Sequence, residues 1–281
     1  MNRMYNLLLA WLFLTVVFAQ AQPHPSYRPS DSLAVAAVLA QTRGSSSTTP
    51  AQRLVAAGRM LLGKPFGAKT LETSPERLVV NLRAFDCTTF LETALALSQT
   101  AVADRKDFHT YQGRLAAVRY RNEKTNDYTA RLHYFTDWLH DKIRRGELED
   151  VTPKLGGRAY AKPVDYMTKH ARLYAQLADR RNLTAMQAVE NELNTRVWQY
   201  IPKTEAAKAE TRMQEGDIVA VTTDIKGLDV VHVGIAVRQN GRVHLLHASS
   251  DQGKVAVSRL PLADYLQKNG RQTGVIVTRL K

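Results

Sequence analysis

The stretch that decides the fold is Phe85-Asp86-Cys87-Thr88-Thr89-Phe90, which contains the only cysteine among the 281 residues. The apolar residues that follow Cys87 recur at the spacing of one helix face: Phe90, Leu91, Ala94, Leu95 and Leu97. This periodicity predicts a helix that begins at about Cys87 and turns one face towards a hydrophobic core.

A cysteine in the first turn of a helix has two interpretations. Backbone N–H groups at a helix start are unpaired and the macrodipole is positive there, so the thiol pKa is expected below its ordinary value of about 8.5. The resulting thiolate would be a nucleophile. Alternatively, Cys87 is a small buried hydrophobe, because free cysteines are among the most buried residue types.

The N-terminal residues predict export. A basic start at Asn2-Arg3-Met4 precedes an apolar run from Leu7 to Phe18 and a small-x-small signature at Ala19-Gln20-Ala21. This pattern is typical of a signal peptide, here residues 1–21. No later stretch reaches the roughly 20 apolar residues of a membrane helix. We therefore expect a periplasmic or secreted protein without an integral membrane segment after cleavage.

Export also bears on the cysteine. A single cysteine cannot form an internal disulfide, although the compartment favours disulfides. A chemical role for the Cys87 thiol is therefore favoured over a purely structural one.

Composition excludes several classes of function. With 44% hydrophobic and 23% charged residues, the chain is ordinary globular material, and residues 22–281 fit a single domain. The formal charge of +13 suits a polyanionic cell envelope, but a solvated basic face explains it equally well. We find no zinc-ligand spacing, phosphate loop or aromatic-interleaved basic strip, so no metal, cofactor or nucleic acid is expected.

Helices are expected on both sides of the cysteine stretch. The first is predicted over Ser32–Gln41, and a capping box at Thr49-Pro50-Ala51-Gln52 opens a second that Gly63 ends. From about 100 to 212 the chain is predicted to be a charged, mostly helical insertion. Its most aromatic stretch, Leu132–Leu139, fits either core packing or a cleft for a sugar or peptide.

The last seventy residues change to short β-branched runs separated by turn residues. These runs predict an antiparallel meander within 213–281, with strands at Asp217–Val221, Val230–Val237, Val243–His247, Val255–Ser258 and Gly274–Thr278.

An Asn-Gly pair at 240–241 fixes the register of one hairpin, since it predicts a two-residue type I′ turn. Gly234 then lies opposite His247, and His232 is the diagonal neighbour of His247, roughly 7–8 Å away between backbones. The other face is expected to be core and carries Val231, Val233, Ile235, Val237, Leu246 and Ala248. Both histidines are therefore predicted on the opposite surface.

A lone histidine on a strand is more often structural than catalytic. Two on one face, with a cysteine at a helix start, match the needs of cysteine hydrolases. Such enzymes require a base for the thiol and a third group that orients the base.

Four motifs occur in one order: Asp86-Cys87-Thr88, Gly216-Asp217-Ile218-Val219, His232-Val233-Gly234-Ile235 and His247-Ala248. Together they resemble the papain-like cell-wall cysteine hydrolases of the NlpC type. Further segments are similar to a branch of exported N-acetylmuramoyl-L-alanine amidases: Gly63-Lys64-Pro65-Phe66, 81–92, 131–138, Tyr200-Ile201-Pro202 and 227–232.

This resemblance implies an α+β papain-like fold in which the cysteine helix packs on the C-terminal antiparallel sheet. It implies Cys87 as nucleophile, His232 as general base and acid, and His247 as the orienting member. The implied substrates are peptidoglycan fragments, the muramyl peptides, and no cofactor is implied.

The resemblance also nominates substrate-binding residues. Asp86 either caps the helix or faces the substrate, and Asp229 either holds a loop or contributes to the cleft. His133 and Tyr134 are cleft candidates because the resemblance extends to them. One departure stands out: relatives with the Gly-x-Pro-Tyr form have a tyrosine hydroxyl near the site where this chain has Phe66, so one donor for the oxyanion would be missing.

Two further hypotheses remain open. The same chemistry could cut the γ-D-glutamyl bond to the next diamino acid, which would make the protein an endopeptidase. The fold could also serve a non-catalytic protein that binds the cell envelope.

Overall fold

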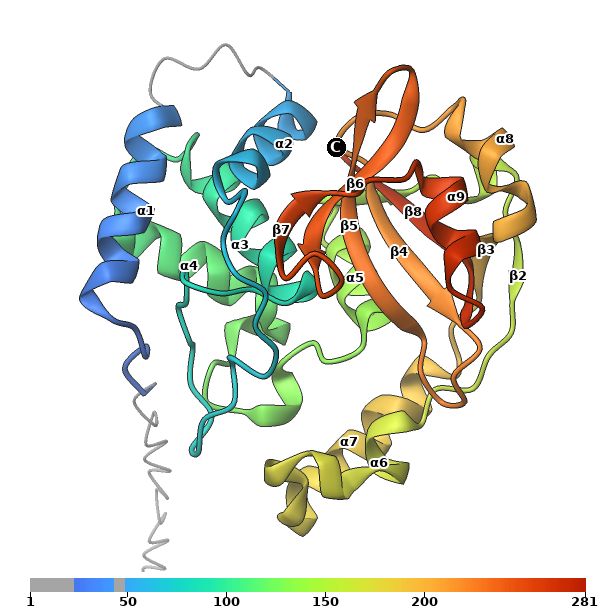
Figure 1. Cartoon of the computed structure of the whole chain (residues 1–281). Coiled ribbons are helices and arrows are strands. Elements are labelled where there is room, and N and C mark those ends of the chain that lie inside the picture. The colour runs from blue at the N-terminus through green and yellow to red at the C-terminus, as the bar shows by residue number, and fades with distance from the viewer. Residues whose placement is uncertain (1–22, 43–48) are drawn as a thin grey trace, which may run out of the picture.

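The computed structural model describes residues 23–42 and 49–281. The predicted signal peptide lies outside this part of the chain. Helices α1 to α4 gather on one side of the molecule and an antiparallel sheet with α8 and α9 lies on the other (Figure 1). No helix within the described ranges is long and apolar enough to cross a bilayer.

The helices follow the chain with short 3₁₀ turns between several of them. Their bounds are α1 (Pro29–Thr42), α2 (Pro50–Met60), α3 (Cys87–Thr100), α4 (Phe108–Arg119), α5 (Phe135–Arg144), α6 (Tyr166–Lys169), α7 (Arg180–Leu193), α8 (Ala206–Glu210) and α9 (Leu262–Lys268).

Capping boxes start α2 and α3, as local sequence chemistry predicts. At α2, the Thr49 side chain accepts from the Gln52 N–H. At α3, the Asp86 carboxylate accepts from the Thr89 N–H at 2.8 Å, and the Thr89 hydroxyl accepts from the Asp86 N–H at 2.9 Å. The prediction that Cys87 begins its helix is therefore confirmed.

The sheet is antiparallel and has the order β2-β3-β8-β4-β5-β6-β7, with β1 also paired to β8. Its strands are β1 (Leu148–Asp150), β2 (Arg158–Tyr160), β3 (Trp198–Pro202), β4 (Ile218–Thr223), β5 (Val230–Gln239), β6 (Arg242–Ser249), β7 (Lys254–Val257) and β8 (Gln272–Leu280). The five predicted strands correspond to β4 to β8.

Two parts of the predicted topology are wrong. The last strand, β8, does not follow β7 in a meander. It pairs instead with β4, the first of the five predicted strands. The segment predicted as a helical insertion also adds β1, β2 and β3 to the sheet. Ile201 pairs with Val275 and Pro202 with Gly274, so Tyr200-Ile201-Pro202 belongs to a strand that extends the sheet.

The predicted hairpin register is confirmed. Ile235 pairs with Leu246 and Val237 with His244 across a turn in which Asn240 and Gly241 both have positive φ, +49° and +78°. At its other end β5 contains a bulge, because Val221 pairs with His232 while Thr222 pairs with Val230. Val231 is consequently 37% exposed, which corrects its assignment to the core.

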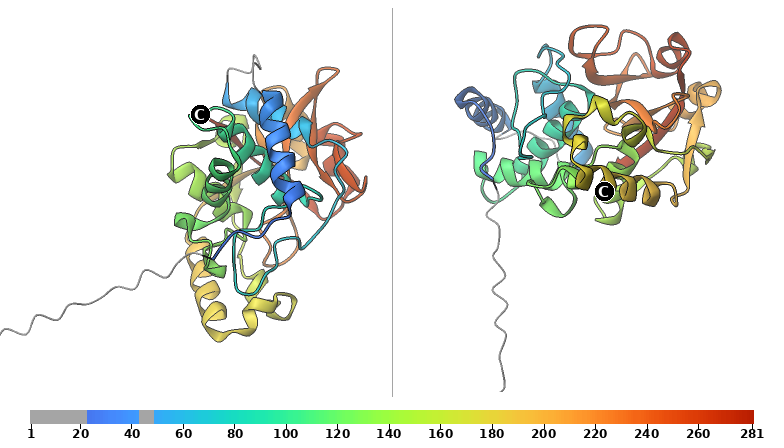
Figure 2. Two further views of the ribbon diagram at one scale, coloured as in Figure 1. Left: turned by 90° about the vertical axis from the view of Figure 1, so that its left-hand side faces the viewer. Right: turned by 90° about the horizontal axis from the view of Figure 1, so that it is seen from below.

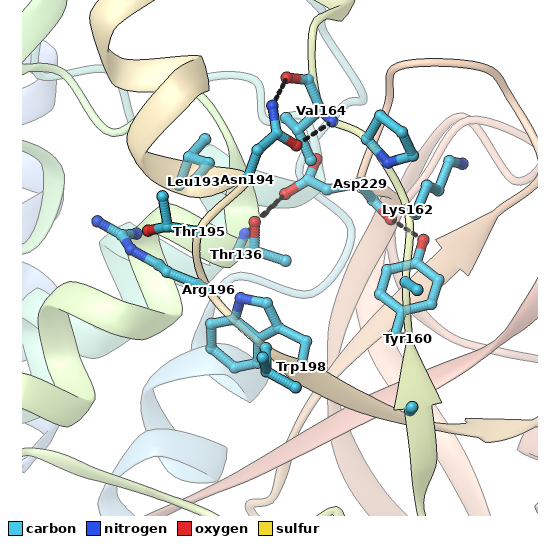
Figure 3. Close-up of a pocket in the computed structure, with 14 residues that line it drawn as sticks. Thr136, Tyr160, Lys162, Val164, Leu193, Asn194, Thr195, Arg196, Trp198 and Asp229 are labelled. Atoms are coloured by element: carbon cyan, nitrogen blue, oxygen red, sulfur yellow. Dashed lines mark hydrogen bonds between the residues drawn. The ribbon is translucent and has the colours of Figure 1, made fainter.

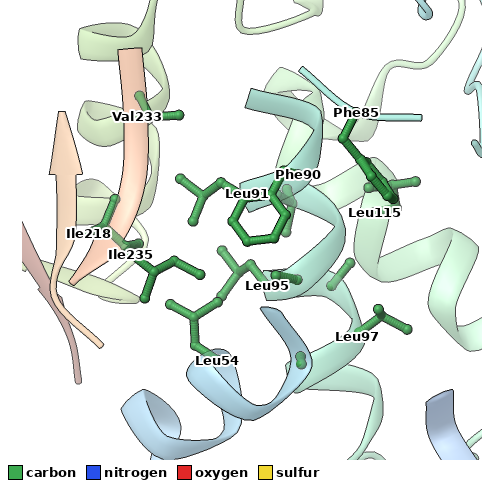
Figure 4. Close-up of a cluster of buried hydrophobic side chains, with 14 of the residues drawn as sticks. Leu54, Phe85, Phe90, Leu91, Leu95, Leu97, Leu115, Ile218, Val233 and Ile235 are labelled. Atoms are coloured by element: carbon green, nitrogen blue, oxygen red, sulfur yellow. The ribbon is translucent and has the colours of Figure 1, made fainter. Parts of the chain in front are cut away.

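Apolar side chains cover both faces of the sheet. On one face, Leu91 and Leu95 of α3 point towards Val233 and Ile235 of β5 (Figure 4). On the other, α8 and α9 cover a second buried cluster that includes Leu266. Helices α6 and α7 form a lobe that projects below the sheet (Figures 1 and 2) and has its own small core.

Candidate active site

The start of α3 abuts β5 at the residue that follows His232. There the backbone N–H of Val233 interacts with the Cys87 sulfur. The core contacts of Leu91 with β5 hold the helix in this position (Figure 4). The fold therefore brings Cys87, distant in sequence, against the backbone next to His232.

The two histidines form a direct contact. His232 Nε2 lies 2.5 Å from His247 Nδ1, and the rings meet edge to face at 81° with centroids 4.8 Å apart. Gly234 permits this approach, since a Cβ built there would lie 3.2 Å from the His247 Cβ. The predicted pairing of these histidines on one face is confirmed.

The contact between the rings constrains their protons. If His232 is to accept a proton at Nδ1, its Nε2 carries hydrogen and donates to His247 Nδ1. His247 then carries its own hydrogen at Nε2, a buried atom without a partner among the described residues. His232 Nδ1 is thus the ring nitrogen left for chemistry.

The face that carries the histidines is not an open surface, which corrects the sequence-based expectation. His247 is completely buried, while Cys87 and His232 are half-buried. Tyr265 of α9 covers the pair, with ring centroids 6.2 Å from His232 and 5.7 Å from His247. Sequence reasoning missed Tyr265 because α9 has only seven residues and gives no strong helical pattern.

Burial sets the protonation states of the cluster. It raises the pKa of the Cys87 thiol to about 11, with a further increase from the Asp86 carboxylate, against the opposing hydrogen bonds of Val233 and Thr88. Burial also lowers the pKa of His232 to about 4 and, together with the charge of His232, the pKa of His247 to about 3. The expectation of a thiol pKa below 8.5 is therefore wrong: desolvation outweighs the helix start.

A polar pocket of about 340 Å³ opens beside His232. Its lining includes Tyr265, Gln272 and an ion pair between Lys268 and Asp251 at 3.9 Å. This pocket gives a ligand access to the exposed part of the His232 ring.

Asp86 is the N-cap of α3, which agrees with the interpretation that it caps the helix. Phe66 lies next to the turn before Cys87: it bridges Phe85, and the Gly67 N–H donates to the Phe85 carbonyl at 2.9 Å.

The remaining predicted residues make internal contacts. His133 Nε2 lies 2.8 Å from the Tyr128 carbonyl oxygen, and burial lowers the pKa of His133 well below its ordinary value. Tyr134 is 3% exposed, and its hydroxyl donates to Glu190 and accepts from the Met167 N–H. These contacts place Tyr134 between α5 and the lobe, inside the protein.

Asp229 is 1% exposed, and its Oδ2 accepts from the N–H and the hydroxyl of Thr136 at 2.7 and 2.8 Å. It anchors the segment that leads into β5 and also lines a second cavity. Across residues 23–42 and 49–281, no group of three His, Cys, Asp or Glu side chains could hold a metal ion.

The fold and this cluster define a class: an α+β protein in which a thiol lies against the backbone beside one of two contacting imidazoles. The chain belongs to the AmiA-like family, described as N-acetylmuramoyl-L-alanine amidase-like, whose profile matches residues 56–275. The predicted resemblance to these amidases is confirmed.

Solved structures agree with the family. An N-acetylmuramoyl-L-alanine amidase from Bacteroides uniformis is 37% identical, with a TM-score of 0.78 over 83% of this chain and 99% of that one. A protein from Bacteroides fragilis described as a candidate xylanase is 36% identical, with a TM-score of 0.75 over 80% and 99%. A Legionella pneumophila protein at 22% identity shares the fold, with a TM-score of 0.65 over 88% and 94%. A comparison with curated proteins found no match.

Proposed function

We propose that the protein is an exported peptidoglycan amidase with a papain-like, NlpC-type core that hydrolyses the amide between N-acetylmuramic acid and L-alanine. The observation that carries the proposal is the short contact between His232 and His247 beside the half-buried Cys87. Membership of the AmiA-like family supports the choice of bond.

In the proposed reaction, the Cys87 sulfur attacks the lactyl carbonyl carbon while the thiol proton moves to His232 Nδ1. The tetrahedral intermediate collapses as its C–N bond breaks, and His232 returns the proton to the leaving amine of the stem peptide. Water then attacks the thioester, with His232 taking its proton, and regenerates the thiol. His247 orients the His232 ring through the hydrogen bond between them.

The start of α3 supports the transition state as well as the nucleophile. The backbone N–H of Cys87 belongs to the first turn of the helix, where donors are free to stabilise a developing oxyanion. Phe66 offers no hydroxyl for this purpose, so in the proposed reaction the oxyanion depends on backbone donors.

Glycoside hydrolysis, as the name of the Bacteroides fragilis protein suggests for that protein, is less well supported here. Most glycosidases use two carboxylates that flank the scissile bond. Among the described residues that line the pocket beside His232, only Asp251 has a carboxylate. The chemistry of the pocket therefore favours acyl transfer.

The test is product analysis with purified muramyl peptides. Wild-type protein is expected to release free stem peptide, and Cys87→Ala is expected to release none while keeping the wild-type circular dichroism spectrum. His244→Gln is the control, because His244 lies on the same hairpin but bonds the Ser258 carbonyl.

Each competing hypothesis has its own outcome in this assay. A muramyl dipeptide product would identify the endopeptidase. Binding without any turnover by the wild type would identify the non-catalytic envelope protein. Full release of stem peptide by Cys87→Ala would show that Cys87 is not the nucleophile.

A further inference from the structure

A second cavity, of about 520 Å³, lies where β2, β3, the end of α7 and the segment before β5 meet. Figure 3 shows Trp198 and Tyr160 at one end of this cavity and Asn194 and Val164 at the other. The reaction proposed above uses none of these side chains.

The aromatic end of the cavity is rigidly held. The Tyr160 hydroxyl donates to the Asp229 carbonyl at 2.8 Å, and the Tyr160 ring lies 5.1 Å from the Tyr200 ring. Asp229 is itself fixed by Thr136. A fixed aromatic surface binds a flat ligand face at little cost in conformational entropy.

Two features of this end point to a ligand. Val197, beside Trp198, is 89% exposed and adds an apolar side chain to the rim of the cavity. The indole N–H of Trp198 is buried without an acceptor among the described residues. An apolar ring face with nearby carbonyl or hydroxyl acceptors would complement both.

The charges of the cavity distinguish a sugar from a peptide. Arg196 is already paired with Asp137 at 2.8 Å and with Glu192 at 2.6 Å. Lys162 donates to the Thr223 carbonyl, and burial lowers the pKa of its amine. An acidic stem peptide needs unpaired cations, whereas a neutral acetamido sugar needs only donors and an apolar surface.

The position of the cavity fits the saccharide side of the substrate. Asp229, which lines the cavity, lies three residues before His232, and three residues span at most about 10 Å. A ligand whose lactyl carbonyl lies at Cys87 could therefore extend its sugar rings towards the cavity.

We propose that this cavity binds a pyranose ring of the saccharide carried by the muramyl peptide, with Trp198 and Tyr160 as the stacking surface. The proposal rests on the proposed amidase function. It assigns recognition of the glycan to a site separate from the thiol and the histidines.

Binding is tested by calorimetry with the full-length Cys87→Ala variant and the disaccharide of N-acetylglucosamine and N-acetylmuramic acid, without peptide. Trp198→Ala is expected to weaken binding of the disaccharide at least tenfold, and Trp198→Phe, which keeps an aromatic ring, much less. Val197→Glu places a charged side chain at the rim of the cavity. Because Val197 is exposed, this variant is expected to fold, and it tests the site even if Trp198→Ala misfolds. Leu173→Ala, at a residue 57% exposed on the lobe, is the matched control.

Kinetics with otherwise wild-type protein separate the outcomes. Val197→Glu is expected to raise KM for the disaccharide peptide without lowering kcat, and to leave a lactyl-peptide without sugar unaffected. Unchanged disaccharide binding in Val197→Glu and Trp198→Ala would overturn the proposal even if Cys87 is the nucleophile. Loss of stem-peptide binding instead would assign the cavity to the peptide. Turnover by Cys87→Ala would refute the proposed reaction and not the binding result.

Discussion

At the level of single residues, the cluster combines a neutral Cys87 thiol, held against the Val233 backbone, with a neutral His232 imidazole. The pKa of Cys87 is raised to about 11 and that of His232 is lowered to about 4, in both cases mainly by burial. In the proposed reaction, the proton would therefore leave sulfur during the attack itself. A thiol with so high a pKa reacts slowly with alkylating reagents at neutral pH. Slow alkylation of Cys87 would therefore not by itself support the hypothesis of a non-catalytic envelope-binding protein.

The pH dependence of kcat/KM follows from these protonation states. His232 accepts a proton only when neutral, so activity is expected to fall as pH drops through about 4, its lowered pKa, and to be level from pH 5.5 to 8. Steady-state rates with a muramyl peptide between pH 3 and 9 measure this profile. An acid limb centred near 6.5, the ordinary pKa of histidine, would contradict it.

Acid also affects the folded state, so the profile needs a control. Because the pKa values of His232 and His247 are lowered in the folded protein, the unfolded chain binds more protons between pH 6.5 and 4. Stability is therefore lost as pH falls. Brief acid exposure followed by assay at pH 7 separates reversible titration from unfolding.

Gly234 provides a test of the histidine geometry. An added Cβ would lie 3.2 Å from the His247 Cβ and from the Leu246 carbonyl oxygen. Gly234→Ala is expected to displace His247 and lower kcat by about 10- to 100-fold, since small misplacements of catalytic groups are costly. Gly113→Ala, where a Cβ meets nothing within 4 Å, is expected to leave kcat unchanged. Equal kcat values for both variants would count against an orienting role for His247.

At the level of elements, α9 provides a cover for the histidine pair. Tyr265→Ala would admit water to the contact between the rings, so kcat is expected to fall about tenfold and the acid limb to move from about 4 towards 6.5 as the pKa of His232 recovers. Tyr265→Phe keeps the ring and is expected to leave the limb in place. If the pH profile of Tyr265→Ala matches that of the wild type, α9 does not determine the pKa of His232.

Helices α3 and α4 are joined by a buried ion pair. Arg119 Nε lies 2.7 Å from Glu92, both side chains are almost fully buried, and the guanidinium also donates to the Val79 carbonyl at 2.6 Å. Arg119→Met leaves Glu92 as an unpaired buried charge and is expected to cost about 3–5 kcal/mol in the free energy of unfolding. Arg105→Met, which removes an exposed pair with Asp107, is expected to cost less than about 1 kcal/mol. Urea unfolding compares the two, and equal losses would contradict this view.

For the whole molecule, features set by neighbouring residues could be predicted from the sequence. The start of α3 depends on Asp86 and Thr89, and the register that brings His232 to His247 depends on Asn240 and Gly241. Both are local chemistry, so the α+β class and the contact between the two histidines could be predicted.

Features set by distant contacts could not be predicted. The three-residue strands β1 and β2 have too little pattern to be seen, and the bulge at Val231 arises from pairing with β4. The raised pKa of Cys87 depends on burial by the assembled protein. The same holds for Tyr265, which meets the histidines only through tertiary packing.

The central claim is that Cys87 carries the muramoyl acyl group during turnover. Mass spectrometry of protein quenched with acid after mixing with a muramyl peptide tests it most directly. The account predicts a transient adduct on the tryptic peptide that contains Cys87, with the mass of the muramoyl acyl group and without amino acids. Turnover with no adduct on Cys87, or an adduct that retains L-alanine and D-glutamate, would contradict it.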